Sequence, residues 1–143
     1  MPKRIAFSQC CGVVIDVQDF FLAQLDARLR SSIEINIANL IRLLGYFRIP
    51  VLATLERPLD VKGQLPELLG ECFGDLANGL GTSFEKDFFD LTKEPKIRSH
   101  LGKLKKKQMI VAGCDCLSIN SRISRNCCGV RRVAPSSSRL AWG

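Results

Sequence analysis

No apolar run in this sequence of 143 residues approaches the roughly 20 residues that a transmembrane helix requires, so a membrane-spanning protein is not expected. The N-terminal stretch MPKRIAFSQCCGVVID has basic residues followed by apolar ones. Gln9 and Asp16 interrupt it, however, and no small-residue cleavage site follows. We therefore interpret this stretch as a β-strand rather than a secretion signal, and expect a cytoplasmic protein with no membrane partner.

Histidine is nearly absent, since His100 is the only one in the sequence. The seven cysteines are odd in number, include two adjacent pairs and follow no secretion signal, which argues against a disulfide framework. A zinc site is not expected either, because Cys114 and Cys116 are spaced more tightly than the usual C-x2-C pair and His100 is remote in sequence. We expect a reducing compartment and neither a metal nor another cofactor.

The excess of positive over negative charge is unevenly distributed along the chain. The net charge is +7, and the last thirty residues hold five arginines against one acidic residue. The basic run KLKKKQ, residues 103–108, has no interleaved aromatic residues and is typical of a solvated helix end. A nucleic-acid partner would therefore rest on charge alone and is not expected. With 46% hydrophobic and 24% charged residues, the composition is that of an ordinary globular domain.

Short apolar runs alternate with helical patterns along the chain. One run of β-branched residues ends at Ile15, a second ends near Thr54, and a third is QMIVAG, residues 108–113. Each run is typical of a strand that is buried on both faces. Alternation of such strands with helices predicts an α/β fold with a mostly parallel sheet. We expect a single domain over residues 1–134 and a tail over residues 135–143.

Apolar residues at helical spacing predict three helices, over residues 32–47, 66–72 and 96–107. Ser31 or Ser32 can cap the first of them. The segment NGLGTSFEKDFFD around Lys86 has turn-forming residues and then extended ones, and we interpret it as a loop.

Three reactive groups are expected at the edge of the sheet formed by the carboxyl ends of the strands, where parallel α/β proteins build their sites. Asp16 follows the first strand, Cys116 follows the third, and Lys86 comes from the intervening loop. A cysteine thiolate is a nucleophile, a nearby cation lowers the thiol pKa, and a carboxylate can accept the thiol proton. Each group also has an ordinary structural role, in a turn, on the surface or in the core. These residues alone therefore leave the function open.

Five segments resemble, in order and approximate spacing over residues 12–113, the isochorismatase-like cysteine hydrolases: VVIDVQDFF, RIPVLATLERP, GQLPEL, EKDFFD and IVAG. The resemblance implies a Rossmann-like three-layer αβα sandwich and an Asp–Lys–Cys triad made of Asp16, Lys86 and Cys116. It also implies a small amide or related substrate, with Gln18 and Phe21 as candidate substrate-binding residues, and a homo-oligomer. The segment TLERPLDVKG has no histidine, which argues against the metal-binding cluster of nicotinamidase-type relatives, and its Glu56 is given no catalytic role.

The resemblance weakens after Gly113. The family places its nucleophile about six residues past the corresponding glycine, whereas Cys116 is three residues past Gly113, with Cys114 as the second candidate. A shortened turn changes the oxyanion hole, and a misplacement of about 1 Å can cost roughly 100-fold in rate. The alternative to a hydrolase is therefore a catalytically impaired α/β scaffold or an oligomeric binding protein.

The sequence after Gly113 also differs in composition, with five arginines, no lysine and four of the seven cysteines. The segment GVRRVA is expected to be a further strand, and the chain ends some tens of residues earlier than members of the family usually do. A truncated or frame-shifted gene and simple divergence both explain these features. A coding DNA in which no shifted frame restores a D-x-C-V pattern and a longer tail would exclude a frame shift.

Overall fold

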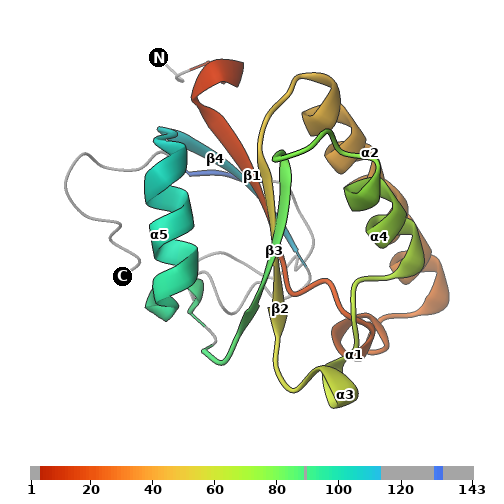
Figure 1. The fold of residues 1–143 in the computed structure, drawn as a ribbon. Coiled ribbons are helices and arrows are strands. Elements are labelled where there is room, and N and C mark those ends of the chain that lie inside the picture. The colour runs from red at the N-terminus through yellow and green to blue at the C-terminus, as the bar shows by residue number, and fades with distance from the viewer. Residues whose placement is uncertain (1–3, 89, 114–130, 134–143) are drawn as a thin grey trace.

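The computed structural model of the protein describes residues 4–88, 90–113 and 131–133 (Figure 1). The strands are β1 (Cys10–Ile15), β2 (Val51–Glu56), β3 (Gly81–Lys86), β4 (Gln108–Gly113) and β5 (Arg131–Val133). The helices are α1 (Asp19–Leu22), α2 (Ala27–Tyr46), α3 (Leu59–Lys62), α4 (Glu67–Gly74) and α5 (Pro95–Leu104), and the 3-10 turns are η1 (Phe7–Gln9) and η2 (Leu91–Lys93). Among these residues, no helix has the length and apolar character needed to cross a membrane.

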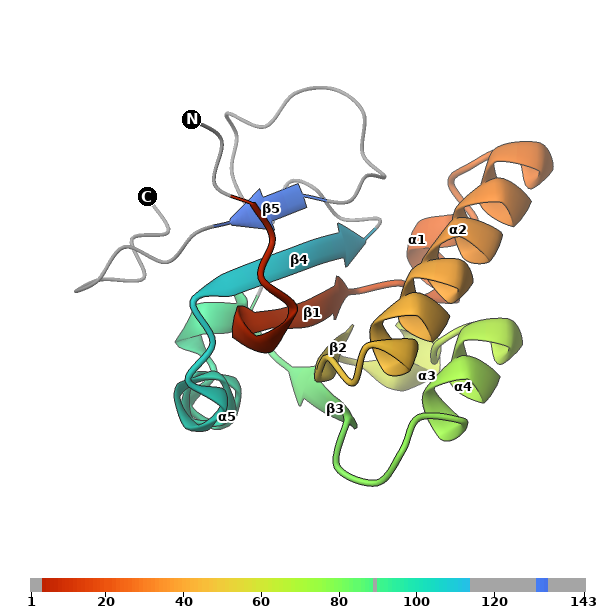
Figure 2. The same ribbon diagram turned by 90° about the horizontal axis from the view of Figure 1, so that it is seen from above.

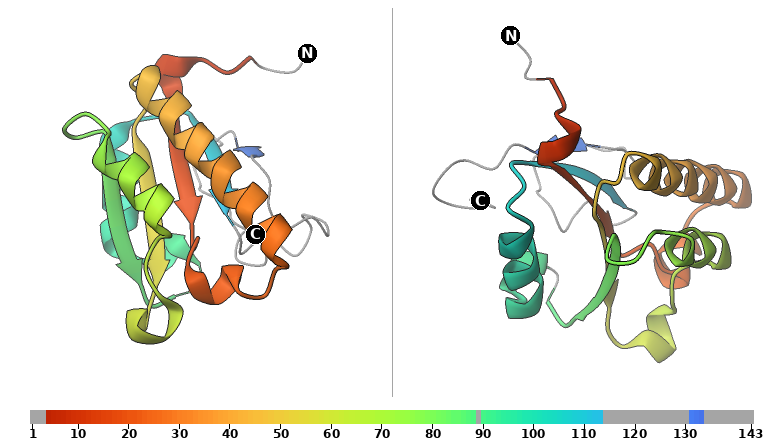
Figure 3. Two further views of the ribbon diagram at one scale, coloured as in Figure 1. Left: turned by 90° about the vertical axis from the view of Figure 1, so that its right-hand side faces the viewer. Right: turned by 45° about the horizontal axis from the view of Figure 1, so that its top comes forward.

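The strands form one sheet in the order β3-β2-β1-β4-β5, in which β1 to β4 are parallel and β5 is antiparallel to β4. Helices α2 and α4 cover one face of the sheet and α5 covers the other (Figure 2). The predicted three-layer α/β fold with a mostly parallel sheet is therefore confirmed. The short helices α1 and α3 lie near the carboxyl ends of the parallel strands, on the side where the site is expected (Figure 3).

The core has two halves, one on each face of the sheet. Along β1, Cys10 and Val14 pack into the half that contains the buried residues of α2 and α4, whereas Cys11, Val13 and Ile15 pack into the half that contains Ile97 of α5. All six residues of β1 are buried. A strand covered on both faces has no polar side to display, which explains the near-continuous apolar run.

The segment around Lys86 is a strand, so the predicted loop is wrong. β3 pairs with β2 in parallel from Gly81 opposite Val51 to Lys86 opposite Glu56. β3 lies at one end of the sheet that the described strands form, and its exposed side chains at Ser83 and Glu85 give it a polar sequence. An edge strand needs no continuous apolar run, which is why hydrophobic patterning did not identify it.

The predicted start of the first long helix is also wrong. α2 begins at Ala27, and the side chain of Asp26 caps it by accepting the N–H of Leu29 at 2.9 Å, in place of the predicted Ser31 or Ser32. The first turn of α2 is exposed apart from the half-buried Arg30, so the apolar periodicity begins only one turn later.

The other predicted ends of helices and strands differ from the observed ends by one or two residues or by one helical turn. β2 continues to Glu56 rather than ending near Thr54, and α5 ends at Leu104 because Lys105 adopts a left-handed conformation with φ 51°. The strand predicted within GVRRVA is confirmed as β5.

β1 and β4 approach each other closely at their carboxyl ends. A Cβ atom built on Gly113 would overlap the backbone carbonyl oxygen of Ile15, its partner across the two strands. The nearest atoms are backbone atoms and the Cβ of Ile15, which no side-chain rotation can move away, so this position of β4 requires glycine.

We expect Gly113→Ala to lower the free energy of unfolding by about 1–3 kcal/mol, because the added methyl group forces the two strands apart. Gly102→Ala is the matched control, since Gly102 lies in α5 and a Cβ added there would occupy open space. The control should stabilise the protein by about 0.5–1 kcal/mol. Urea denaturation measures both changes, and equal effects of the two variants would refute the close-contact explanation.

Candidate functional site

Asp16 occupies a sharp turn directly after β1. Its φ is 51°, in the left-handed region that non-glycine residues seldom adopt. Its N–H donates to the carbonyl of Thr54 at 3.1 Å, and its own carbonyl accepts the N–H of Gln18 at 3.0 Å. Such conformations cost of order 1–3 kcal/mol and gather at functional sites. These two hydrogen bonds help to hold the turn in place at the edge of the sheet.

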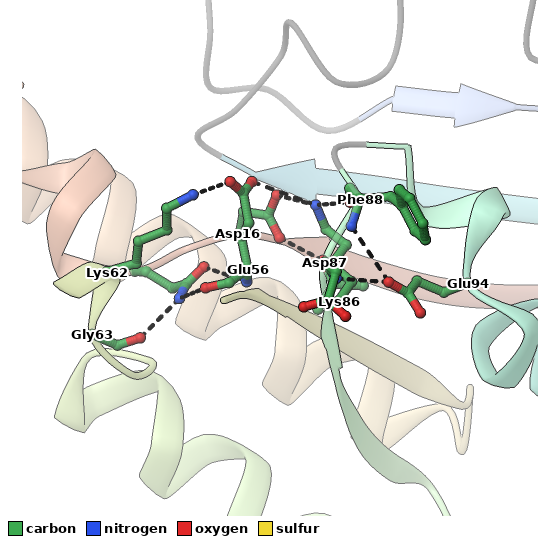
Figure 4. Close-up of polar contacts among 10 residues, drawn as sticks. Asp16, Glu56, Lys62, Gly63, Lys86, Asp87, Phe88 and Glu94 are labelled. Atoms are coloured by element: carbon green, nitrogen blue, oxygen red, sulfur yellow. Dashed lines mark hydrogen bonds and ion pairs between the residues drawn. The ribbon is translucent and has the colours of Figure 1, made fainter. Parts of the chain in front are cut away.

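The carboxylate of Asp16 is completely buried and has two close partners (Figure 4). The Thr54 hydroxyl donates to Oδ1 at 2.9 Å, and Nζ of Lys86 lies 2.7 Å from Oδ2. Lys86 is also completely buried, and its Nζ donates to the carbonyl of Phe88 at 3.1 Å. The structure therefore brings together Asp16 and Lys86, which are 70 positions apart in the sequence and come from the ends of β1 and β3.

Burial raises the pKa of the Asp16 carboxyl above its ordinary value, because removal from water disfavours the charged form. The hydrogen bond and the charge of Lys86, together with the Thr54 hydroxyl, oppose this shift, and the negative charge of Glu56 adds to it. The carboxylate thus binds a proton more readily than an exposed aspartate does.

Glu56 is a site residue that sequence reasoning missed. The register of β2 and β3 pairs it with Lys86, and its Oε2 lies 3.7 Å from Lys86 Nζ. Its Oε1 accepts a hydrogen bond from Nζ of Lys62, at the end of α3. Its proximity to Lys86 follows from the pairing of β2 with β3, and the segment around Lys86 was not predicted to be a strand.

The buried side chain of Gln18 links three segments of the chain through hydrogen bonds. Its side-chain oxygen accepts the N–H of Glu56 at 2.8 Å, and its side-chain nitrogen donates to the carbonyls of Glu56 at 3.1 Å and Gly63 at 2.8 Å. The amide therefore ties the turn after β1 to the end of β2 and to the end of α3. Its predicted contact with substrate stays a prediction, whereas its role in positioning Glu56 is evident from these bonds.

Phe21 lies half-buried on α1, beside the outer part of this polar network. Its ring packs edge-on against that of Phe20, with centroids 5.3 Å apart, and Nζ of Lys62 lies 5.8 Å from its centroid. Phe21 is thus placed next to the charged residues, and its contact with substrate stays a prediction.

Cys114 and Cys116, the candidate nucleophiles, lie outside the described residues. β4 ends at Gly113, which is paired with Ile15, so the strand that precedes both cysteines ends beside Asp16. Within the described part of the chain, the cysteines Cys10, Cys11 and Cys72 are all buried. Burial first, and then the neighbouring Cys10, raises the pKa of Cys11 to about 11, which makes this thiol a poor nucleophile.

His100 lies on α5, and its ring packs against that of Phe84 in β3, with the ring centroids 5.2 Å apart. This contact gives His100 a role in packing α5 against the sheet. In the ranges that the structure describes, no group of three or more His, Cys, Asp or Glu residues is arranged to hold a metal ion.

No protein-family model and no curated protein matches the sequence, but solved structures match the fold. YcaC from Escherichia coli, described as an octameric hydrolase of unknown specificity, has a TM-score of 0.65 and 19% identity, with 77% of this chain and 52% of that chain covered. MAR1 ribonuclease from Caenorhabditis elegans has a TM-score of 0.66 and 23% identity, with 79% and 54% covered. An isochorismatase from Pseudomonas putida has a TM-score of 0.62 and 20% identity, with 78% and 59% covered.

The chain spans little more than half the length of these three proteins. Within that span, it has the fold of the isochorismatase-like hydrolases, as the resemblance of its sequence predicts.

Proposed function

We propose that this chain is a cysteine-dependent hydrolase of a small amide or related carbonyl compound, and that Asp16, Lys86 and Cys116 carry the reaction. The observation that carries the proposal is the completely buried ion pair between Asp16 and Lys86, 2.7 Å apart, at the edge of the sheet beside the end of β4. Removing two charges from water costs several kcal/mol per ion, so such pairs are poor stabilising devices. Buried charged groups with a perturbed pKa are concentrated at functional sites.

The position of Cys116 in the sequence fits this assignment. It follows Gly113, the last residue of β4, by three residues, and three extended residues span at most about 11 Å. Cys114 is the second candidate for the nucleophile.

In the proposed reaction, Asp16 accepts the thiol proton and the Lys86 ammonium stabilises the thiolate. The sulfur attacks the carbonyl carbon, forming a C–S bond while the C=O electron pair moves to oxygen. Collapse of this intermediate breaks the C–N bond, and the amine leaves with the proton held by Asp16. Water then attacks the thioester and gives one proton to Asp16. The C–S bond breaks, the acid leaves, and the thiolate recovers its proton.

We also propose that the protein is a cytoplasmic homo-oligomer. β3 lies at one end of the described sheet, where it pairs only with β2 among the described strands. Unpaired strand edges in proteins are usually covered. The octameric hydrolase YcaC is one example of an assembly with this fold. Cys11 and Cys72 are free thiols, which fits a reducing compartment.

Ribonuclease activity is the second candidate function, because MAR1 ribonuclease shares the fold and the chain carries a net charge of +7. RNA cleavage by the wild-type protein that Lys86→Met abolishes would favour this alternative over amide hydrolysis. Cleavage that persists in the variant would trace to a contaminating nuclease.

Iodoacetamide labelling at near-neutral pH tests the proposed thiolate. We expect one cysteine, identified by peptide mapping as Cys116 or Cys114, to react at least about 10-fold faster than the others, since a lowered thiol pKa raises the thiolate fraction. Asp16→Asn and Lys86→Met should abolish this advantage, whereas Asp75→Asn, which removes an exposed carboxylate after α4, should not. Uniformly slow labelling of the wild-type protein would instead indicate a catalytically impaired scaffold.

The titration of Asp16 tests its role as proton acceptor. We expect its carboxyl carbon, assigned in 13C NMR spectra by its loss in Asp16→Asn, to titrate with a midpoint above the ordinary pKa of 3.8. The folded-state pKa is raised, so the contribution of Asp16 to stability is fully present below 3.8 and is lost as the pH rises through the folded-state pKa. A midpoint below 3.8 would mean that the attraction of Lys86 outweighs burial, and Asp16 would then be a weak proton acceptor.

A further inference from the structure

Two carboxylates share one buried ammonium at the edge of the sheet (Figure 4). Lys86 Nζ lies 2.7 Å from Oδ2 of Asp16 and 3.7 Å from Oε2 of Glu56. The first carboxylate follows β1 and the second ends β2, the strand that separates β1 from β3 in the sheet. Lys86 therefore reaches Asp16 across the end of the strand that carries Glu56.

The second carboxylate is held firmly in place. Gln18 bonds to both the N–H and the carbonyl of Glu56, and Lys62 binds Oε1 of its side chain. The Glu56 side chain is only 13% exposed and that of Lys62 only 19%. Glu56 is thus largely withdrawn from water, so its charge is felt by its neighbours without full screening.

Among the described residues, the charged groups that face this centre come from four elements. Asp16 comes from the turn after β1, Glu56 from β2, Lys62 from α3, and Lys86 from β3. Asp87, which follows Lys86, is paired with Arg57 at 2.8 Å and is exposed. The buried network therefore contains two carboxylates and two ammonium groups, which balance each other in charge.

We propose that Glu56 is a positioning residue of the site: it shares Lys86 with Asp16, which makes Asp16 a stronger proton acceptor and leaves Lys86 a negative partner once Asp16 has been protonated. This inference rests on the proposed hydrolase function. It gives a role to a residue to which the sequence assigned none.

The charge changes during proton transfer explain why a second carboxylate is useful. When Asp16 takes the proton of the nucleophile, it becomes neutral, and Lys86 loses the charge of one of its two carboxylate neighbours. Glu56 remains negative, so the buried ammonium keeps a nearby opposite charge while it stabilises the new thiolate. The network then carries one net positive charge, which matches the negative charge of the new thiolate.

The same geometry strengthens Asp16 as a base before the transfer. Each carboxylate disfavours a negative charge on the other, and both draw on one ammonium group. The negative charge of Glu56 accordingly raises the pKa of Asp16, in addition to the larger effect of burial.

Glu56→Gln tests the inference, because it keeps the size and the hydrogen-bonding capacity of the side chain and removes its charge. We expect the 13C NMR titration midpoint of Asp16 to move to lower pH. We also expect labelling of the reactive cysteine to slow by roughly tenfold for each pKa unit by which this midpoint falls, because a weaker acceptor takes up less of the thiol proton. Glu71→Gln, which removes an exposed carboxylate from α4, is the matched control and should change neither quantity.

Lys62→Met provides a second variant with the opposite expected sign, and it keeps the inference testable if Glu56→Gln fails to fold. Without Lys62, the charge of Glu56 is no longer offset, so the titration midpoint of Asp16 should move to higher pH. An unchanged midpoint in whichever variant folds would overturn the role of Glu56. A wild-type protein without a fast-reacting cysteine would instead overturn the proposed hydrolase function, so the two failures are distinguishable.

Discussion

The buried ion pair between Asp16 and Lys86 is the interaction on which the rest of the site depends. Two opposite charges are stable in a protein interior only when they lie close together and their remaining polar atoms are satisfied. Here the geometry requires the ends of β1, β2 and β3 to be level with one another, Asp16 to adopt a left-handed conformation, and Thr54 to donate its hydroxyl. The pair thus couples the register of three strands to one chemical centre.

The sheet supplies this register through close contact as well as through hydrogen bonds. β1 is buried on both faces, and the approach of its end to Gly113 leaves no space for a side chain. Because β4 ends at Gly113 opposite Ile15, one residue before Asp16, the strand that precedes Cys114 and Cys116 in the sequence ends next to the acid. The same core packing that stabilises the fold therefore fixes where the acid lies relative to the end of β4.

Sequence patterns predicted the parts of the molecule that are set by local burial. β1, β2 and β4 have apolar runs because both faces of the sheet are covered, whereas β3 was missed because an edge strand can be polar. The strand pattern placed Asp16 and Lys86 at one edge of the sheet, and the family resemblance joined them in a triad, since no periodicity links residues 70 positions apart. Glu56 was not predicted because its proximity to Lys86 follows from strand register, which is a property of the folded sheet.

The contrast between Asp16 and Gln18 shows how one short turn serves both packing and chemistry. A carboxylate at the end of an apolar strand is removed from water by the core that the strand helps to build, and that burial is the main reason for its raised pKa. Two residues later, the amide of Gln18 fixes the backbone of Glu56, and Glu56 shares Lys86 with Asp16. The proton affinity of the acid therefore depends on how well the core near β1 excludes water.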